Sequence, residues 1–101
     1  MWVMVLFDLP TDSKKARREY TRFRSRLKKD GFTMLQYSVY GRACPSEENA
    51  VVHENRVQKN LPPAGQVRVL TLTDKQFTRM RIYYGKKREK NEKAAEQLSF
   101  F

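Results

Sequence analysis

The sequence between residues 14 and 29 carries nine cations and one anion, a set of side chains suited to gripping phosphate groups. Five of the cations are arginines, whose planar guanidinium group can donate two parallel hydrogen bonds to one phosphate. An ordinary exposed helix face mixes both signs of charge, because opposite charges four residues apart stabilise each other. The excess therefore indicates a surface that contacts a polyanion. Its members are Lys14, Lys15, Arg17, Arg18, Arg22, Arg24, Arg26, Lys28 and Lys29.

Asp8 is the residue on which any catalysis would have to depend. It ends a strongly apolar run, residues 1–7, where a carboxylate has no packing role. One interpretation is structural: the carboxylate accepts hydrogen bonds from backbone amides of the turn that follows. The other is functional: Asp8 binds Mg²⁺ or Mn²⁺, and in a homodimer two Asp8 carboxylates share one ion that activates water against a phosphodiester. The residues by themselves leave both interpretations open.

The other residues capable of catalysis do not form a site. His53 is the single histidine and lies with Ala50 and Val57 on the apolar side of a predicted helix, so we expect it in the core. Cys44 is expected to act as a small apolar residue. One cysteine excludes an internal disulfide and, with one histidine, a zinc cluster. We therefore expect a reducing, cytoplasmic compartment, and no signal-peptide pattern contradicts it.

The whole chain is strongly basic, with 21 Lys and Arg against 11 Asp and Glu and a net charge of +10. Such an excess attracts polyanions directly and through release of counterions from phosphates, so nucleic acid is the favoured partner. A membrane surface is the alternative, but the longest apolar run is residues 1–7 and no lipidation motif is present. Duplex binding through phosphates is favoured over single strands, because helical spacing places Tyr20 and Phe23 in the core.

Hydrophobic periodicity predicts the elements that position these residues. Residues 1–7 are apolar on both faces and fit a central strand. A helix is predicted to begin at Asp12 or Ser13 and to end at Lys29, before the stop signal of Asp30 and Gly31. Its inward stripe is predicted to be Ala16, Tyr20, Phe23 and Leu27.

The elements predicted for residues 32–84 complete the evidence for the fold class. Residues 32–43 predict two short strands or one bent strand, with the break near residues 36–38. A second helix opens at Pro45-Ser46, and residues 66–73 form the next strand. Residues 77–84 form a further strand or an irregular covering segment. The second helix is predicted to turn inward Ala50, Val57 and Leu61. This order predicts an α+β sandwich of the ferredoxin-like arrangement, with two helices on one face of an antiparallel sheet.

The remaining residues, 86–101, are predicted to be a polar arm attached to a domain of residues 1–85. In a domain this small, an uncovered sheet face or open edge strand invites a partner, and a two-fold homodimer is the commonest solution. We expect such a homodimer, with the arm reaching across to the other subunit. The apolar residues that would dock there are Leu98, Phe100 and Phe101.

Several short motifs together resemble one protein family. They are Phe7-Asp8-Leu9-Pro10-Thr11-Asp12, Gly31-Phe32, Gln36-Tyr37-Ser38-Val39-Tyr40, and Leu72-Thr73-Asp74-Lys75-Gln76-Phe77 with Arg79-Met80. Their order and spacing across residues 1–85 are similar to those of the second CRISPR-associated protein, the small subunit of the spacer-acquisition complex. Members that accompany type II systems are the most similar.

The resemblance implies a ferredoxin-like homodimer that bridges two dimers of the CRISPR-associated integrase and holds the protospacer duplex on its basic surface. In this family the C-terminal strand crosses between subunits, a role that residues 98–101 would have here. Members are also described as metal-dependent endonucleases acting on RNA or DNA, with the aspartate that corresponds to Asp8 as metal ligand. Phe7 stands where some members carry a tyrosine. The functional hypotheses are therefore a DNA-binding adaptor, an Asp8 nuclease, and an unrelated RNA-binding or toxin-type ferredoxin domain.

Overall fold

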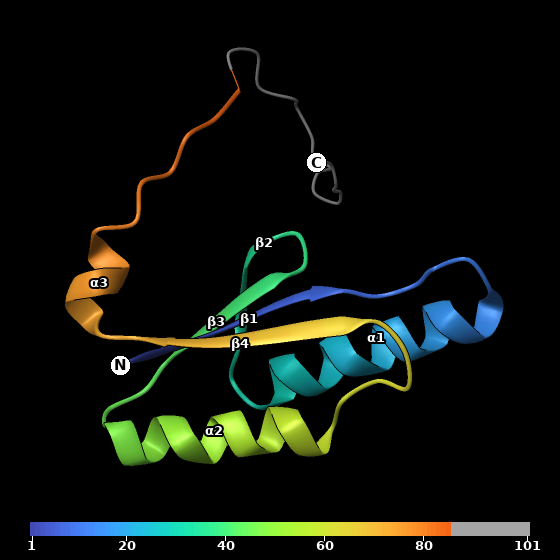
Figure 1. Cartoon of the computed structure of the whole chain (residues 1–101), viewed down its shortest axis with the longest axis horizontal. Coiled ribbons are helices and arrows are strands. Elements are labelled where there is room, and N and C mark those ends of the chain that lie inside the picture. The colour runs from blue at the N-terminus through green and yellow to red at the C-terminus, as the bar shows by residue number, and fades with distance from the viewer. Residues whose placement is uncertain (86–101) are drawn as a thin grey trace.

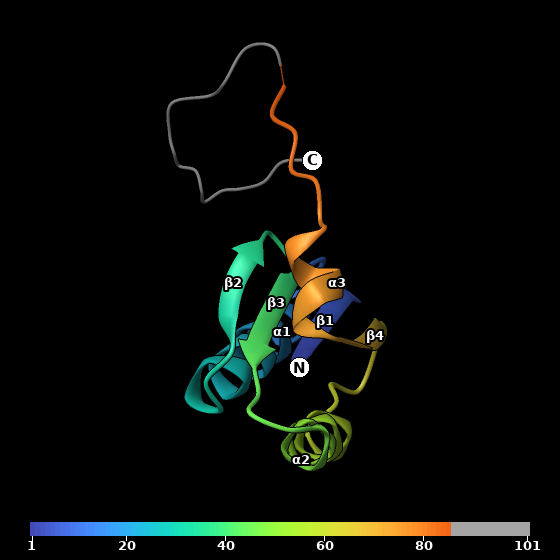
Figure 2. The same cartoon turned by 90° about the vertical axis from the view of Figure 1, so that its left-hand side faces the viewer.

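The structure is a computed structural model that describes residues 1–85. Its elements follow in the order β1 (Trp2–Asp8), α1 (Lys14–Lys29), β2 (Thr33–Gln36), β3 (Val39–Ala43), α2 (Glu47–Lys59), β4 (Gln66–Leu72) and α3 (Asp74–Thr78). The strands form one sheet in the order β2-β3-β1-β4, and all neighbouring pairs are antiparallel. Helices α1 and α2 lie side by side against one face of that sheet (Figure 1; Figure 2). The predicted ferredoxin-like α+β class is confirmed.

Helix α1 begins and ends where its sequence predicts. Ser13 is the N-cap, and its hydroxyl accepts a hydrogen bond from a backbone N–H of the first turn at 3.0 Å. Asp30 caps the other end, and Gly31 follows with a φ of 88°, a left-handed conformation that would strain a residue with a side chain. Of the predicted inward stripe, Ala16 is half-buried and the buried members are Tyr20, Phe23 and Leu27.

The core lies between the two helices and the inner face of the sheet. Side chains alternate along a strand, so the odd-numbered residues of β1 point toward the helices, and Val3 and Val5 are fully buried. Phe7 continues this row, and its ring centroid lies 5.1 Å from that of Phe23 in an edge-on arrangement. Tyr40 of β3 stacks on Phe7 with centroids 5.8 Å apart. The prediction that β1 is a central strand is confirmed, because it pairs with both β3 and β4.

The opposite face of the sheet carries apolar side chains toward the Trp2 end and the polar residues Asp8 and Arg68 toward the other, and within residues 1–85 a helix covers it at the Trp2 end alone. There Trp2 stacks on Phe77 of α3, with ring centroids 3.8 Å apart. Further along, Met4 pairs in register with Gly41 and with Leu70, whose side chain is 49% exposed. The residues of β1 on this face are Trp2, Met4, Leu6 and Asp8. An apolar sheet surface that no other element covers is typical of a surface that binds a partner.

Residues 32–43 form two strands, as one of the two sequence interpretations expected. Strands β2 and β3 are antiparallel, and their register shifts between Met34 and Gln36. Ser38, in the connection between them, has a φ of 64°, which a tight turn requires here. The inward face predicted for α2 is buried at Ala50 and Val57 but wrong at Leu61. Leu61 is 49% exposed because α2 has already ended at Lys59.

Of the two interpretations of residues 77–84, the strand is wrong, and the irregular segment is observed, but it follows a short helix and does not cover the sheet. Helix α3 spans Asp74–Thr78, and residues 79–85 have no regular structure and extend away from the sheet (Figure 1). The helix starts there because Thr73 and Gln76 form a reciprocal capping box. That signal is present in the sequence, but apolar periodicity over so short a helix does not detect it. The predicted arm, residues 86–101, lies outside the described residues.

Candidate nucleic-acid interface

The outer face of α1 presents a continuous basic surface. Eight of its nine cations have exposed side chains, because they lie away from the stripe that packs on the sheet. Arg22 is within 3.6 Å of the Glu19 carboxylate, and Arg17 donates a hydrogen bond to the Thr11 carbonyl at 3.2 Å. The middle of the surface is slightly hollowed between side chains of Arg18, Thr21, Arg22, Ser25, Arg26 and Lys29. The predicted clustering on one helix is thus observed, while binding of phosphate by these residues stays a prediction.

Arg24 differs from the other cations, which corrects its assignment to the surface that contacts a polyanion. Its side chain is half-buried, its guanidinium carbon lies 5.9 Å from the centroid of the Tyr20 ring, and its Nε atom is shielded from solvent. A cation over an aromatic face in this way stabilises packing. Two further tyrosines, Tyr37 and Tyr40, lie near Arg24. The hydrogen bond with Tyr20 raises the pKa of Tyr37 to about 12, and burial raises the pKa of Tyr40. Arg24 therefore belongs to the fold more than to the basic surface.

Asp8 lies at the end of β1 with an exposed side chain, on the open face of the sheet. Its register partner on β4 is Gln66. Within residues 1–85 its carboxylate accepts no hydrogen bond and forms no ion pair, so the structural interpretation of Asp8 as a turn cap is not supported. The loop before β4 approaches it closely: Gly65 has a φ of 99°, and a Cβ there would lie 2.8 Å from the Asp8 carbonyl oxygen. Only glycine fits at that position without displacing the end of β1.

One carboxylate per chain is a sparse metal site. No group of three or more His, Cys, Asp or Glu side chains that could hold a metal occurs among the described residues. Mg²⁺ keeps most of its water ligands and can be bound through one or two carboxylates. Asp8, exposed and free of partners within residues 1–85, therefore suits Mg²⁺ or Mn²⁺ if a second copy supplies a second carboxylate.

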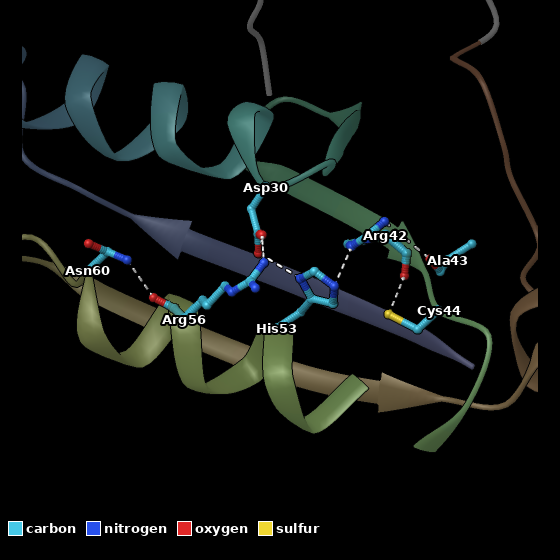
Figure 3. A network of polar contacts seen from close by, with 7 residues as sticks. All are labelled: Asp30, Arg42, Ala43, Cys44, His53, Arg56 and Asn60. Carbon is cyan, nitrogen blue, oxygen red and sulfur yellow. Dashed lines mark hydrogen bonds and ion pairs between the residues drawn. The ribbon is translucent and has the colours of Figure 1, made fainter. Parts of the chain in front are cut away.

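A network of polar contacts surrounds His53, as Figure 3 shows. Its Nε2 atom accepts a hydrogen bond from Arg42 Nε at 3.0 Å, so its Nδ1 atom donates to Asp30 at 2.8 Å. Asp30 also binds Arg56 at 2.6 Å. The network joins the end of α1 to β3 and α2, and His53 is 4% exposed, which confirms the expectation that it lies in the core. Cys44 is buried nearby as expected, and burial raises the pKa of its thiol.

The charge on Asp30 stabilises the folded state. Burial raises the pKa of its carboxyl, but the hydrogen bonds from His53 and Arg56 and the positive charge of Arg56 outweigh burial and hold that pKa below its usual value of 3.8. A carboxyl with a depressed pKa in the folded state contributes stability above its unfolded pKa and loses it as pH falls through its folded pKa.

We expect the free energy of unfolding to fall as the medium is acidified from about pH 5 to about pH 2, partly because Asp30 is protonated. The variant Asp30→Asn should be less stable than the parent at neutral pH by about 1 to 3 kcal/mol, because hydrogen bonds to a charged acceptor are lost. Urea unfolding at several pH values measures both effects. The two proteins should converge at the acid end, and a constant difference across the range would contradict this role of Asp30.

No helix among the described residues is long and apolar enough to cross a membrane. The fold and these sites instead define a ferredoxin-like α+β protein with one strongly basic helix and an exposed aspartate at a strand end. The family model described as "CRISPR associated protein Cas2" matches residues 1–80. The chain belongs to the Cas2 family, as its motifs led us to expect.

Individual relatives agree with this assignment. A protein of Parvibaculum lavamentivorans named CRISPR-associated endoribonuclease Cas2 is 54% identical over 101 residues, which cover all of both chains. A protein of Flavobacterium psychrophilum with the same name is 46% identical over 101 residues, covering all of this chain and 88% of that one. The crystal structure of Streptococcus pyogenes Cas2 at pH 6.5 superposes with a TM-score of 0.62 and 19% identity, covering 83% of this chain and 100% of that one. That similarity supports the fold alone.

Proposed function

We propose that this Cas2 protein is a structural subunit of a CRISPR spacer-acquisition complex, in which a homodimer holds duplex DNA between two integrase dimers. The observation that carries the proposal is that the basic surface and the apolar surface lie on opposite sides of the sheet. The basic face of α1 lies on the helix-covered side of the sheet, while the apolar open face lies on the other side.

This arrangement of the two surfaces matters because dimerisation through the open face would leave the basic helices of both subunits accessible. A second copy would cover Leu70 and its apolar neighbours, which are costly to leave in water. A two-fold axis would then place two copies of the α1 surface on one particle, which suits the regular phosphates of a duplex. Because phosphates carry no base information, such binding would depend on duplex geometry rather than sequence. Association with a type II system is part of the same proposal.

A second candidate function is a metal-dependent endonuclease, and two observations favour it. The relatives at 54% and 46% identity are named endoribonucleases. Asp8 is exposed on the open face, where a two-fold axis would bring two copies toward each other. Asp8 would hold the Mg²⁺ or Mn²⁺, and a bound divalent ion would supply activation of water and stabilisation of phosphoryl charge.

Asp8→Asn distinguishes the two functions. If the adaptor function holds, the variant should support spacer acquisition in cells at about the parental rate, because it leaves the α1 surface intact. If the protein is also a nuclease, the variant should lose cleavage of RNA and DNA by about a hundredfold or more, since removing a metal ligand or catalytic group typically costs that much. Sequencing of the repeat array and gel assays with highly purified protein measure the two activities.

The control for this experiment is the folded state and oligomeric state of Asp8→Asn, by thermal unfolding and sedimentation. A folded, dimeric variant that no longer supports acquisition would overturn the adaptor function. Absence of cleavage by the parent with either ion, or equal cleavage by the variant, would overturn the nuclease function.

A further inference from the structure

The open face of the sheet carries one acid and one base, which lie beside each other. The register of β1 and β4 places Leu6 opposite Arg68 and Asp8 opposite Gln66, so these side chains share the open face. The other residues that β1, β3 and β4 place on this face are uncharged. They are Trp2, Met4, Leu6, Val39, Gly41, Ala43, Gln66, Leu70 and Leu72.

Asp8 and Arg68 do not pair within one chain. They occupy diagonal positions on neighbouring strands, which are about 7 to 8 Å apart and within reach of long side chains. Both side chains are exposed, and neither forms an ion pair with any residue of 1–85. An exposed ion pair adds little to the stability of a single chain, because water solvates both charges. Both groups are therefore available to a partner.

The surface around these two charges suits a second copy of the same chain. Leu35 and Leu70 are 42% and 49% exposed, and Leu35 lies over Gly41, where a Cβ would be 2.8 Å from its Cδ1 atom. In a two-fold interface the same patch meets itself, so each contact between two different residues occurs twice. The patch must therefore be complementary to itself in charge. An acid beside a base meets this requirement, whereas an acid alone would face its own copy.

We propose that two copies of this chain meet through their open faces, with Asp8 of each copy in an ion pair with Arg68 of the other. The two equal ion pairs fix how the sheets are aligned, because a shift of one sheet along the other would separate both pairs. The inference rests on the proposed homodimer, and it adds the residue pair that aligns the subunits. In this dimer Mg²⁺ or Mn²⁺ has to compete with Arg68 for each Asp8 carboxylate.

Charge reversal in the full chain tests the proposed pairing, with dimerisation measured by sedimentation and native mass spectrometry. Arg68→Asp leaves only acids on the open face, and Asp8→Arg leaves only bases. Each variant alone should dimerise at least about tenfold more weakly than the parent, which matches the lower end of coupling between close interfacial charges. An equimolar mixture should form a mixed dimer within about threefold of the parental affinity. Both ion pairs re-form in that mixed dimer, with one copy supplying both bases.

The matched control reverses two charges on the helix-covered side of the sheet. Glu48→Arg and Lys59→Asp alter exposed residues of α2 and should dimerise like the parent, alone or mixed. Circular dichroism should show all these variants folded, because their positions are exposed.

Neutral variants test the same pair without introducing repulsion. Asp8→Asn and Arg68→Gln should each weaken the dimer, and the double variant should lose no more than the weaker single variant. Additive losses would contradict the pairing.

The outcomes separate the inference from the proposed homodimer. Charge-reversal variants that dimerise as tightly as the parent overturn the inference and leave the homodimer intact. Weakened variants that the mixture does not restore also overturn it, because the charges then do not pair between copies. A parent that stays monomeric overturns both the inference and the homodimer.

Discussion

Replacing Arg18 and Arg22 together with glutamate is expected to weaken binding of duplex DNA by at least about a hundredfold at about 0.1 M salt. Removing one cation from a phosphate lowers the affinity by a factor of about eight under those conditions, and the introduced carboxylates add repulsion. Both side chains are exposed on the middle of the basic surface, and the one ion pair that Arg22 forms within residues 1–85 is its 3.6 Å approach to Glu19. Fold and stability should therefore be little changed.

The salt dependence makes this experiment specific. The slope of log binding constant against log salt concentration should become shallower by about two units in the double variant. A control with the same change of charge, Lys59→Glu with Lys75→Glu, alters exposed residues of α2 and α3 outside the basic surface. It should change the slope by less than about one unit. If the control weakens binding as strongly as the α1 variant, general attraction and not this surface holds the DNA.

Phe23→Ala is expected to lower the free energy of unfolding by about 3 to 5 kcal/mol, because it leaves a cavity where a buried aromatic ring was. Phe23 is 2% exposed and meets the Phe7 ring edge-on at 5.1 Å. A small domain has roughly 5 to 15 kcal/mol of stability in total, so the variant should be close to unfolding. Urea denaturation monitored by circular dichroism measures the loss.

Two further variants at α1 show whether packing is the cause. Phe23→Leu keeps most of the apolar volume and should lose clearly less stability than the alanine variant. Thr21→Ala lies on the exposed side of the same helix and should stay within about 0.5 kcal/mol of the parent. A similar loss in Thr21→Ala and Phe23→Ala would mean that helix propensity, and not the contact with β1, dominates. Because Phe23→Ala should be close to unfolding, a loss of DNA binding by this variant would report on the fold and not on phosphate contacts.

Local patterns were sufficient for most of the elements. Ser13 and Gly31 mark the limits of α1 because caps and left-handed turns depend on residue type over a few positions. The central place of β1 followed from its apolar run, and the ferredoxin-like class followed from the order of strands and helices. Helix α3 was missed because its five residues are too few for periodicity, although its capping box was present.

Some features of the candidate sites could likewise be predicted from the sequence, and others depend on tertiary packing. The charge of α1 and the position of Asp8 at a strand end are properties of neighbouring residues, so the sequence by itself determined them. Which cations are free was decided by tertiary packing, because a helical wheel does not show that Arg24 lies beside Tyr20 and the sheet. The contact of Asp30 with His53 joins residues 23 positions apart.

A groove between α1 and α2, like that network, exists because two helices distant in sequence pack on one sheet face. Neither helix alone supplies its lining: Phe23 and Lys29 come from α1, while Arg56 and Val57 come from α2. The basic helix and the strand-end aspartate thus came from the sequence, since residue type and short spacing define them. The groove, the His53 network and the open apolar face came from the tertiary structure, since only the folded chain brings their members together.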